Sequence, residues 1–344
     1  LNKEGLINRN KKISFTFNGK KLFGYEGDTI ASALIANGIH LVGRSFKYHR
    51  PRGFFGAGVE EPNAKLQVEF NGHSEPNVNA TEMELVEGLS ATSQNCWPSV
   101  NFDVGAINNF LKMFFPAGFY YKTFMWPKSF WYKIYEPFIR KAAGLGVASV
   151  EKDKERYEHK FEYCDLLVTG SGPSGLASAY AAAKNGAKVI LAEDKPRFGG
   201  TLLTDDVSID NLSGKDWAEK IITELKSMPN VTVKNRSQVF GYYDHNMLVM
   251  FERVSDHLEK KSKFTPRQRL WYIRAKETIL STGSIERPIV FGNNDTPGIF
   301  LSAAAKEYMK VYGVLVGKKP LIFTNNDSAY ETALEFKKNN VEPI

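Results

Sequence analysis

The chain has 344 residues, of which 42% are hydrophobic and 24% are charged, and this length can hold two or three domains. Its formal net charge is +7, but it has no block made only of lysine and arginine and no zinc-ligand spacing, so we expect no nucleic-acid partner. The two cysteines, Cys96 and Cys164, are too few for a disulfide framework or a four-thiolate cluster, which favours a cytoplasmic protein with reduced thiols and no metal site.

The N-terminal part has the pattern of a small β-grasp domain. Ile13–Phe17 alternates apolar and polar residues, an Asn-Gly turn follows, and Lys21–Tyr25 returns, so the sequence predicts a hairpin. Asp28 can cap a helix over Thr29–Ala36, and Leu66–Phe70 is typical of a further strand.

An aromatic segment follows, "INNFLKMFFPAGFYYKTFMWPKSFWYKIYEPFIRKAAGLG" from Ile107 to Gly146. Lysines and prolines interrupt it, and it contains no run of roughly 20 apolar residues, so we expect no membrane span. Short amphipathic pieces are predicted instead, which cover either another domain of the chain or a partner subunit. The charged stretch Ser149–Tyr163 is predicted to be a linker or a solvated helix.

The second half begins with a βαβ unit. Asp165–Thr169 is a short buried strand, Ser174–Lys184 an alanine-rich helix and Lys188–Ala192 a second strand, and parallel strands with crossover helices follow from this order. The elements predicted after it are a helix at Asp216–Met228, strands at Val231–Val233, Ser237–Tyr243, Met247–Glu252, Leu270–Ala275 and Glu277–Ser281, and a strand–helix pair at Lys319–Thr324 and Ser328–Lys338. The next strand would begin where the chain ends, so we expect the domain to be truncated there.

A glycine motif joins the first strand of this unit to its helix. Gly170 permits the tight turn, Gly172 leaves room for a pyrophosphate against the backbone, and Gly175 lets the helix pack on the strand. With Glu193 at the end of the second strand, the motif predicts dinucleotide binding, the alternative being a structural turn. The cofactor-binding residues are predicted to be Gly170, Gly172, Pro173, Ser174, Gly175, Glu193, Asp194, Arg197, Gly199, Gly200, Thr201, Val239, Thr282 and Gly283.

Glu193 would accept a hydrogen bond from the adenosine ribose, which NAD and FAD share, so the motif itself leaves both open. Two carboxylates, Glu193 and Asp194, would repel a 2′-phosphate, and we therefore expect NAD in preference to NADP. The later segment around Asn325, Asn326 and Asp327 has a strand and a helix but no glycines, so a second nucleotide half is predicted to be degenerate.

No catalytic residue is predicted, because no histidine has a paired carboxylate motif. Five basic residues lie close together and face either a phosphate, an acidic partner or solvent: Arg44, Lys47, His49, Arg50 and Arg52.

Several long stretches resemble the alpha subunits of heterotetrameric sarcosine oxidases. They include "RSFKYHRPRGFFGAGVEEPNA", "PAGFYYKTFMWPKSFW", "GYYDHNMLVMFERVSDHL" and "PRQRLWYIRAKETILSTGSIERPIVFGNNDTPG". The resemblance implies an α/β protein with a ferredoxin-like β-grasp domain at 1–100, an aromatic-rich helical connector and linker at 101–162, and an incomplete FAD/NAD(P)-type Rossmann-like domain at 163–344. Relatives that hold a [2Fe–2S] cluster carry cysteines near residues 44–60, where this chain has none, so we expect no cluster.

The resemblance also implies the protein's activity and companions. It predicts an oxidoreductase subunit, inactive alone, that assembles with beta, gamma and delta subunits. The complex would oxidise sarcosine to glycine with release of peroxide and pass a one-carbon unit to tetrahydrofolate. The cofactors expected are NAD in this chain, with FAD as the less favoured choice, and FMN or FAD in a partner subunit. The alternatives are a subunit of a related opine- or proline-type amine dehydrogenase and a structural nucleotide-binding scaffold.

Overall fold

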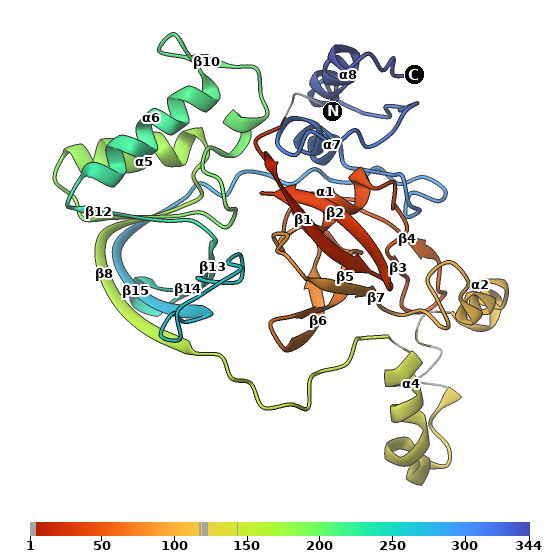
Figure 1. The fold of residues 1–344 in the computed structure, drawn as a ribbon. Coiled ribbons are helices and arrows are strands. Elements are labelled where there is room, and N and C mark those ends of the chain that lie inside the picture. Colours follow the sequence, from red (N-terminus) through yellow and green to blue (C-terminus); the bar gives the residue numbers. More distant parts are fainter. Residues whose placement is uncertain (1–4, 117, 119–122, 143) are drawn as a thin grey trace. The chain divides into compact units, whose positions relative to one another are not determined.

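The computed structural model describes residues 5–116, 118, 123–142 and 144–344, and the chain falls into two units (Figure 1). One unit combines Leu1–Lys152 with Arg287–Ile344, and the other is Asp153–Glu286. The sequence-based boundaries lie elsewhere, at residues 100 and 162, and they assign everything from 163 onward to one domain. In the structure, residues 287–344 pack with the N-terminal part of the chain.

A five-stranded sheet forms the centre of the first unit, in the order β2-β1-β7-β5-β6. The predicted hairpin is confirmed as β1 and β2, and β1 also pairs in parallel with β7, as in a β-grasp fold. Alternate residues of β1, Ile13, Phe15 and Phe17, are buried, so the period of two marks the core face. The strands are β1 (Asn8–Phe17), β2 (Lys20–Glu26), β5 (Lys65–Phe70), β6 (His73–Asn79) and β7 (Ser90–Ser93), with a separate short pair β3 (Gly43–Arg44) and β4 (Pro51–Arg52).

The predicted first helix is confirmed as α1 (Ile30–Ala36), and it is buried along nearly its whole length. Its cap is Thr29 rather than the predicted Asp28. Thr29 Oγ1 accepts a hydrogen bond from Ser32 N at 3.2 Å, and Ser32 Oγ accepts one from Thr29 N at 2.9 Å, which is a capping box. Asp28 stands one residue further out and accepts from Ser32 Oγ at 2.7 Å instead.

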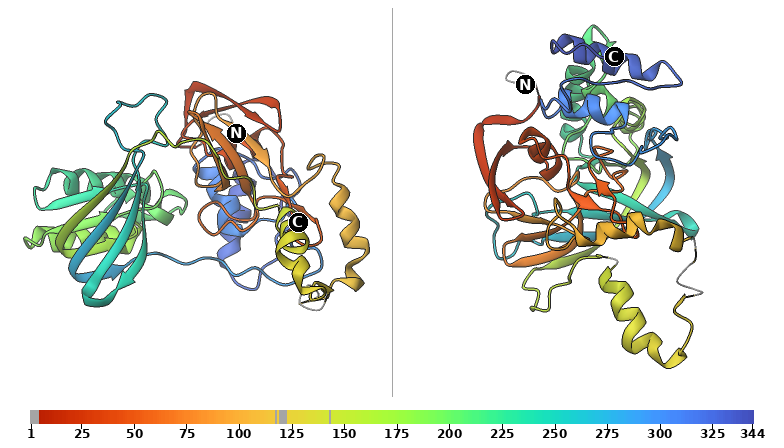
Figure 2. Two further views of the ribbon diagram at one scale, coloured as in Figure 1. Left: turned by 90° about the horizontal axis from the view of Figure 1, so that it is seen from below. Right: turned by 90° about the vertical axis from the view of Figure 1, so that its right-hand side faces the viewer.

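The aromatic segment forms short helical turns outside the sheet, gold to yellow in Figure 2. Pro116 and Pro127 lie between helical pieces, as predicted, whereas Pro137 lies in the first turn of α4, and most of the apolar side chains described in the segment are exposed. No helix among the described residues is long and apolar enough to cross a membrane. The pieces are η1 (Val104–Ala106), α2 (Ile107–Phe110), η2 (Lys112–Phe114), η3 (Lys128–Phe130), the π-helix η4 (Trp131–Tyr135) and α4 (Glu136–Ala142).

The C-terminal residues add two helices, α7 (Ser302–Lys310) and α8 (Ser328–Lys338), to the first unit. Tyr308 of α7 is fully buried, and its hydroxyl donates to Gly56 O at 3.0 Å. The helix predicted at α8 is confirmed, but Lys319–Thr324 forms no strand in the described structure. A strand there needs a neighbouring strand to pair with, and the sheet of this unit ends at β2 and β6.

The second unit is built on a six-stranded sheet in the order β12-β9-β8-β15-β14-β13. The predicted βαβ unit is confirmed, since β12, β9, β8 and β15 run in parallel, and the strands predicted after it include β14 and β13, which return antiparallel. The elements are β8 (Tyr157–Thr169), α5 (Pro173–Lys184), β9 (Val189–Ala192), η5 (Gly200–Leu203), β10 (Ser208–Ile209), β11 (Leu212–Ser213), α6 (Gly214–Ser227), β12 (Val231–Lys234), β13 (Ser237–Tyr243), η6 (Asp244–Asn246), β14 (Met247–Arg253) and β15 (Gln268–Leu280).

Two strands in this sheet are longer than predicted. β8 begins at Tyr157, inside the stretch predicted to be a linker, and β15 is one strand where two were predicted. The two strands pair in parallel from Tyr157 to Thr169, and this pairing extends the charged stretch into the sheet. Helices α5 and α6 cover one face, where Leu176, Trp217 and Leu225 pack against buried strand residues such as Leu191.

Candidate functional site

The loop between β8 and α5 shows why it needs glycine at two positions. Gly170 has a φ of +97°, and a Cβ there would lie 2.2 Å from Ser281 O at the end of β15. A Cβ on Gly175, in the first turn of α5, would lie 1.9 Å from Gly170 O. Both glycines are therefore required by packing within the protein itself, which brings strand, loop and helix into close contact.

Gly172 differs from these two glycines. It is the N-cap of α5, with a φ of −65° that any residue can adopt, and a Cβ there would meet nothing within 4 Å. Pro173 follows at the first helical position and Ser174 is exposed. The first backbone N–H groups of a helix lack intrahelical acceptors, so this open side of the loop suits a phosphate.

Glu193 ties the loop to the end of β9. It is 6% exposed, and its carboxylate accepts hydrogen bonds from Ser171 N at 2.9 Å, Ser171 Oγ at 2.5 Å and Lys195 N at 3.0 Å. Burial raises the pKa of Glu193 to about 7, and the neighbouring Asp194 adds to the shift. Ser171 was not predicted as a site residue, although a hydroxyl side chain between two glycines of the motif could have indicated it. The ribose contact predicted for Glu193 stays a prediction.

The second glycine pair lies against the first loop. Gly199 N donates to Ser171 Oγ at 3.1 Å, and a Cβ on Gly200 would lie 2.9 Å from Gly172 Cα. Thr201 continues into η5. The structure thus brings Gly199 and Gly200 to the motif, while their predicted role in binding the cofactor, with Thr201, stays a prediction.

The other predicted residues are spread around this loop. Thr282 and Gly283 follow β15, whose last pairing places Ser281 N 2.8 Å from Thr169 O. Val239 lies in β13 and packs against the core on the other side of the sheet. Asp194 accepts at its backbone oxygen from Arg253 Nη2 at 2.8 Å, and Arg197 lies in the loop leading to the second glycine pair.

A second loop in the first unit is organised by carboxylates that the sequence analysis passed over. Glu61 is 1% exposed and accepts hydrogen bonds from the backbone N–H groups of Phe55, Gly56, Asn63 and Ala64, at 2.6, 2.7, 2.7 and 3.2 Å. Its neighbour Glu60 accepts from Ala57 N and Gly58 N at 2.7 and 3.0 Å. Burial raises the pKa of Glu61, although the four N–H donors favour its ionised form. The two side chains close the loop upon itself.

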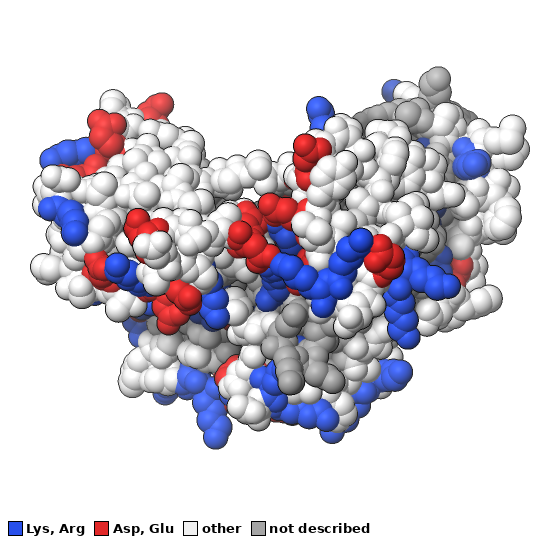
Figure 3. All heavy atoms as spheres, turned by 90° about the horizontal axis from the view of Figure 1, so that it is seen from above, with Lys and Arg blue, Asp and Glu red and all other residues white. Residues whose placement is uncertain are grey.

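The basic loop Arg44–Arg52 is bound within the first unit. Arg50 Nε and Nη2 donate to the two carboxylate oxygens of Asp295 at 2.8 and 2.7 Å, and Arg52 also donates to this carboxylate. We predicted that these basic residues face a phosphate, an acidic partner or solvent. Arg50 and Arg52 instead contact a carboxylate of the same chain. On the face drawn in Figure 3, Lys and Arg side chains are interspersed with Asp and Glu, so the net charge of +7 forms no single basic stripe there.

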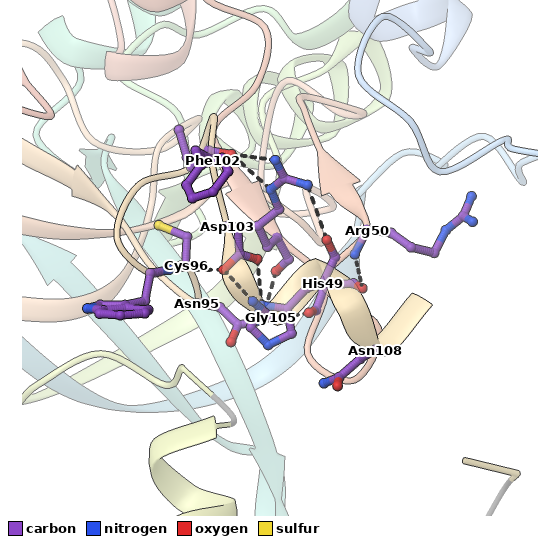
Figure 4. Close-up of polar contacts among 12 residues, drawn as sticks. His49, Arg50, Asn95, Cys96, Phe102, Asp103, Gly105 and Asn108 are labelled. Atoms are coloured by element: carbon purple, nitrogen blue, oxygen red, sulfur yellow. Dashed lines mark hydrogen bonds and ion pairs between the residues drawn. The ribbon is translucent and has the colours of Figure 1, made fainter. Parts of the chain in front are cut away.

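His49 has a carboxylate partner that the sequence did not reveal (Figure 4). Its Nδ1 lies 2.7 Å from Asp103 Oδ2, and Asp103 Oδ1 accepts from Trp97 N at 3.0 Å and Gly105 N at 3.2 Å. Both side chains of the pair are buried, and a Cβ on Gly105 would lie 2.3 Å from the histidine ring. The pair connects two loops and leaves no room beside its ring for a substrate atom at Gly105.

Two family models match the chain. One, a "2Fe-2S iron-sulfur cluster binding domain", covers residues 10–96, and the other, an "FAD dependent oxidoreductase", covers residues 165–248. The L-proline dehydrogenase from P. horikoshii has a similar fold, with a TM-score of 0.65, 20% sequence identity and coverage of 100% of this chain and 55% of that one. The fold and the two family models therefore define an α/β protein with a ferredoxin-like domain followed by a Rossmann-like domain of the FAD-dependent type.

Curated relatives narrow this class. The chain is 52% identical to the sarcosine oxidase subunit alpha of Rhizobium meliloti (strain 1021) over 344 residues, which are 100% of this chain and 35% of that protein. It is 34% identical to the subunit alpha of Corynebacterium sp. (strain U-96) over 334 residues, 96% of this chain and 30% of that protein. The resemblance to sarcosine oxidase alpha subunits is confirmed, and the chain spans about a third of the length of these relatives.

The predicted cofactors are wrong. We expected NAD, with FAD less favoured and no iron–sulfur cluster, whereas the two family models point to FAD and to a domain of the cluster-binding type. The expectation of NAD came from the family resemblance, because Gly170, Gly172, Gly175 and Glu193 would contact only the part of the cofactor that NAD and FAD share and so could not correct it.

The described residues do not fit a cluster. A [2Fe–2S] cluster is generally held by four thiolates, and the two cysteines lie in different units, Cys96 in the first and Cys164 buried in the second. Within the described part of the chain, no group of three or more His, Cys, Asp or Glu side chains could hold a metal ion.

Proposed function

We propose that this protein acts as the alpha subunit of a sarcosine oxidase and that the Gly170–Gly175 loop holds FAD. The observation that carries the proposal is the contrast within the loop, where Gly170 and Gly175 are fixed by packing and Gly172 alone has open space beside it. A pyrophosphate approaching the N-terminus of α5 needs this arrangement. The 52% identity to a sarcosine oxidase subunit alpha supports the activity.

In the proposed reaction, the C–N bond to the methyl group of sarcosine is oxidised to an imine, with loss of two electrons and two protons, one proton from the methyl carbon and one from the nitrogen. Oxygen takes both up to give hydrogen peroxide, and the methyl carbon, now at the oxidation level of formaldehyde, passes to tetrahydrofolate and leaves glycine. Bound FAD would supply two-electron chemistry. This chain's own contribution would be to bind and orient the dinucleotide, through the loop, the Gly199–Gly200 pair and the Glu193–Ser171 hydrogen bonds.

The proposed activity also implies partner subunits. Among the described residues we identify no set of side chains that would oxidise an amine, so we propose that the chain works with the beta, gamma and delta subunits of such an oxidase. We expect the assembled complex, and not this chain alone, to release peroxide when sarcosine is added.

Extraction of the purified complex, followed by mass spectrometry, tests the cofactor. We expect FAD, and we expect Gly172→Val to reduce its content at least about tenfold, because the added side chain would occupy the open space. Gly292→Val is the matched control, since Gly292 also has an ordinary φ and nothing within 4 Å of an added Cβ but lies in the first unit. Unchanged FAD in Gly172→Val, or loss of FAD in both variants, would contradict the proposed site.

A second role remains compatible with this site, a scaffold in which the dinucleotide does no chemistry. The two roles differ in one measurement. If the FAD held by this chain is redox-active, anaerobic sarcosine should bleach its absorbance near 450 nm in the wild-type complex, by about the amount that Gly172→Val loses. Full occupancy without bleaching would show that the dinucleotide is structural.

A further inference from the structure

One segment of the first unit exposes most of its large apolar side chains and buries an acidic one, Asp103. Eight large apolar side chains between residues 97 and 114 are exposed, and we call the six most exposed of them the apolar ledge: Trp97 (70%), Phe102 (70%), Ile107 (58%), Phe110 (84%), Met113 (85%) and Phe114 (75%). A surface helix of a folded domain normally buries such residues and exposes its polar ones. The reversal means that the packing of this unit does not use them.

Polar contacts hold the inner side of this segment to the basic loop. Tyr48 Oη donates to Phe115 O at 2.8 Å, and Lys47 Nζ donates to Pro116 O at 3.0 Å. In the opposite direction, Asn108 Nδ2 donates to Lys47 O at 3.3 Å. The contacts come from three positions around α2, so they fix which way the helical turns face.

Two further contacts anchor the start of the segment (Figure 4). Arg44 Nε and Nη2 donate to Val100 O at 2.9 and 2.6 Å, and the buried pair of His49 and Asp103 joins the basic loop to η1. Phe102, labelled in the same view, lies between these two anchors along the chain. The apolar ledge is therefore presented by a built support rather than by a loose chain end.

The composition of the segment indicates what covers it. Aromatic residues and methionine are enriched at the centres of protein interfaces, while acidic residues are depleted there. From Trp97 to Tyr135 the sequence contains one acidic residue, Asp103, which is buried with His49, and its lysines, such as Lys112, lie among the apolar positions. This pattern complements an apolar patch that has carboxylates around its edge.

We propose that the apolar ledge is a docking surface for a second protein subunit with an apolar patch rimmed by Asp and Glu. The partner's identity as another subunit of the oxidase rests on the proposed function. A membrane surface is the less favoured occupant, because η1, α2 and η2 together run only from Val104 to Phe114, whereas many interfacial helices have about 20–30 residues.

A photo-reactive benzoylphenylalanine at position 110 in the assembled complex identifies what lies against the apolar ledge. We expect a cross-link to a different subunit, at a peptide that contains acidic residues. Cross-links only within this chain, or none to protein, would overturn the proposal. Flotation of the complex with vesicles of phosphatidylcholine and phosphatidylglycerol, lost on Phe110→Asp, would assign the surface to a membrane instead.

A double substitution measures how much the apolar ledge contributes to binding the second subunit. Phe110→Asp with Met113→Asp should raise the dissociation constant between this chain and that subunit at least about thirtyfold, as expected for interface hot spots. The control is Phe264→Asp, because Phe264 is 73% exposed but lies in the second unit, and it should change the constant less than about twofold. Unchanged association in the double variant would contradict the proposal. The FAD content of the same samples reports on the proposed function separately, so the two failures are distinguishable.

Discussion

Two loops of this chain arrange backbone N–H groups in opposite ways. In the second unit, the Gly170–Gly175 loop leads into α5 and has open space beside Gly172. In the first unit, the loop from Phe55 to Ala64 folds around Glu61, whose carboxylate accepts from four backbone N–H groups. The first loop suits an external anion, and the second contains its own.

The difference separates binding from stability. An anion supplied by a side chain is present in every folded molecule, so its removal should lower the free energy of unfolding. An anion supplied by a ligand affects stability only through binding. Substitutions in the Phe55–Ala64 loop should therefore change the free energy of unfolding, whereas substitutions on the open side of the Gly170–Gly175 loop should change ligand binding.

The largest effect is expected at Glu61. Glu61→Ala would leave four N–H groups of a buried loop without their acceptor, and unsatisfied buried groups cost about 1–3 kcal/mol each before water enters. We expect a loss of about 4 kcal/mol in the free energy of unfolding of the first unit. Hydrogen exchange of peptides that cover residues 53–66 should accelerate accordingly.

Two companions test this interpretation. Glu69→Ala removes an exposed carboxylate from β5 and should change stability by less than about 0.5 kcal/mol. Glu61→Gln keeps one acceptor oxygen and should fall between the two. Equal exchange rates for wild type and Glu61→Ala would mean that the carboxylate does not organise the loop.

The next largest effect separates two glycines of the other loop. Gly175→Ala places a Cβ 1.9 Å from Gly170 O, so α5 must shift, and we expect a loss of about 3 kcal/mol. Gly172→Ala meets open space and should cost less than about 1 kcal/mol while still weakening FAD binding. Thermal unfolding and FAD content, measured on both variants, separate the two effects. Since glycine to alanine inside a helix usually stabilises it, a raised melting temperature in Gly175→Ala would contradict the packing argument.

Local sequence patterns predicted much of this structure. The hairpin of β1 and β2, the βαβ unit and the antiparallel strands follow from alternation, turns and helix signals that lie within a few residues of one another. Gly199 and Gly200 were predicted only as cofactor-binding residues, and their contact with the loop arises because both segments follow parallel strands that end at the same edge of the sheet.

What the sequence did not reveal depends on contacts between distant residues. Charged residues at the start of β8 indicated a linker, but pairing with β15 makes a strand of them. In the sequence, Glu60 and Glu61 cannot be told from carboxylates on the surface. They accept hydrogen bonds from backbone N–H groups only because the loop folds around them. No local sequence pattern indicates that residues 287–344 pack with the N-terminal part of the chain either. Long-range pairing therefore accounts for most of the differences.

A third prediction concerns pH and the buried carboxylate beside the glycine loop. Burial raises the pKa of Glu193 to about 7, well above the usual range of a glutamate, so the folded second unit binds the proton more tightly than the unfolded chain. Stability from this group is fully present below about pH 4.5 and is lost as the pH rises toward 7, by up to about 3 kcal/mol. Glu193→Gln should flatten the stability of the second unit over this range, as measured by urea unfolding. An unchanged slope in Glu193→Gln would place the titration on another group.

The smallest effect is expected at Asp295, a third internal anion, whose partners are side chains instead of backbone groups. The hydrogen bonds from Arg50, and then those from Arg52, hold the pKa of Asp295 well below its usual range. Because the carboxylate is 28% exposed and Arg50 26% exposed, water can replace lost partners, and Asp295→Asn should cost only about 1 kcal/mol at neutral pH. A group with a lowered pKa contributes stability above its unfolded pKa and loses it as the pH falls through its folded pKa. The difference between wild type and Asp295→Asn should therefore begin to shrink below about pH 3.8 and vanish only below the lowered pKa of the folded state. Asp327→Asn is the control, because Asp327 lies at the start of α8 and its side chain makes no capping hydrogen bond, and it should leave the free energy of unfolding unchanged.

A loss of unfolding free energy in Asp295→Asn as large as that in Glu61→Ala would contradict this ranking. It would show that side-chain partners organise a loop as firmly as backbone N–H donors do.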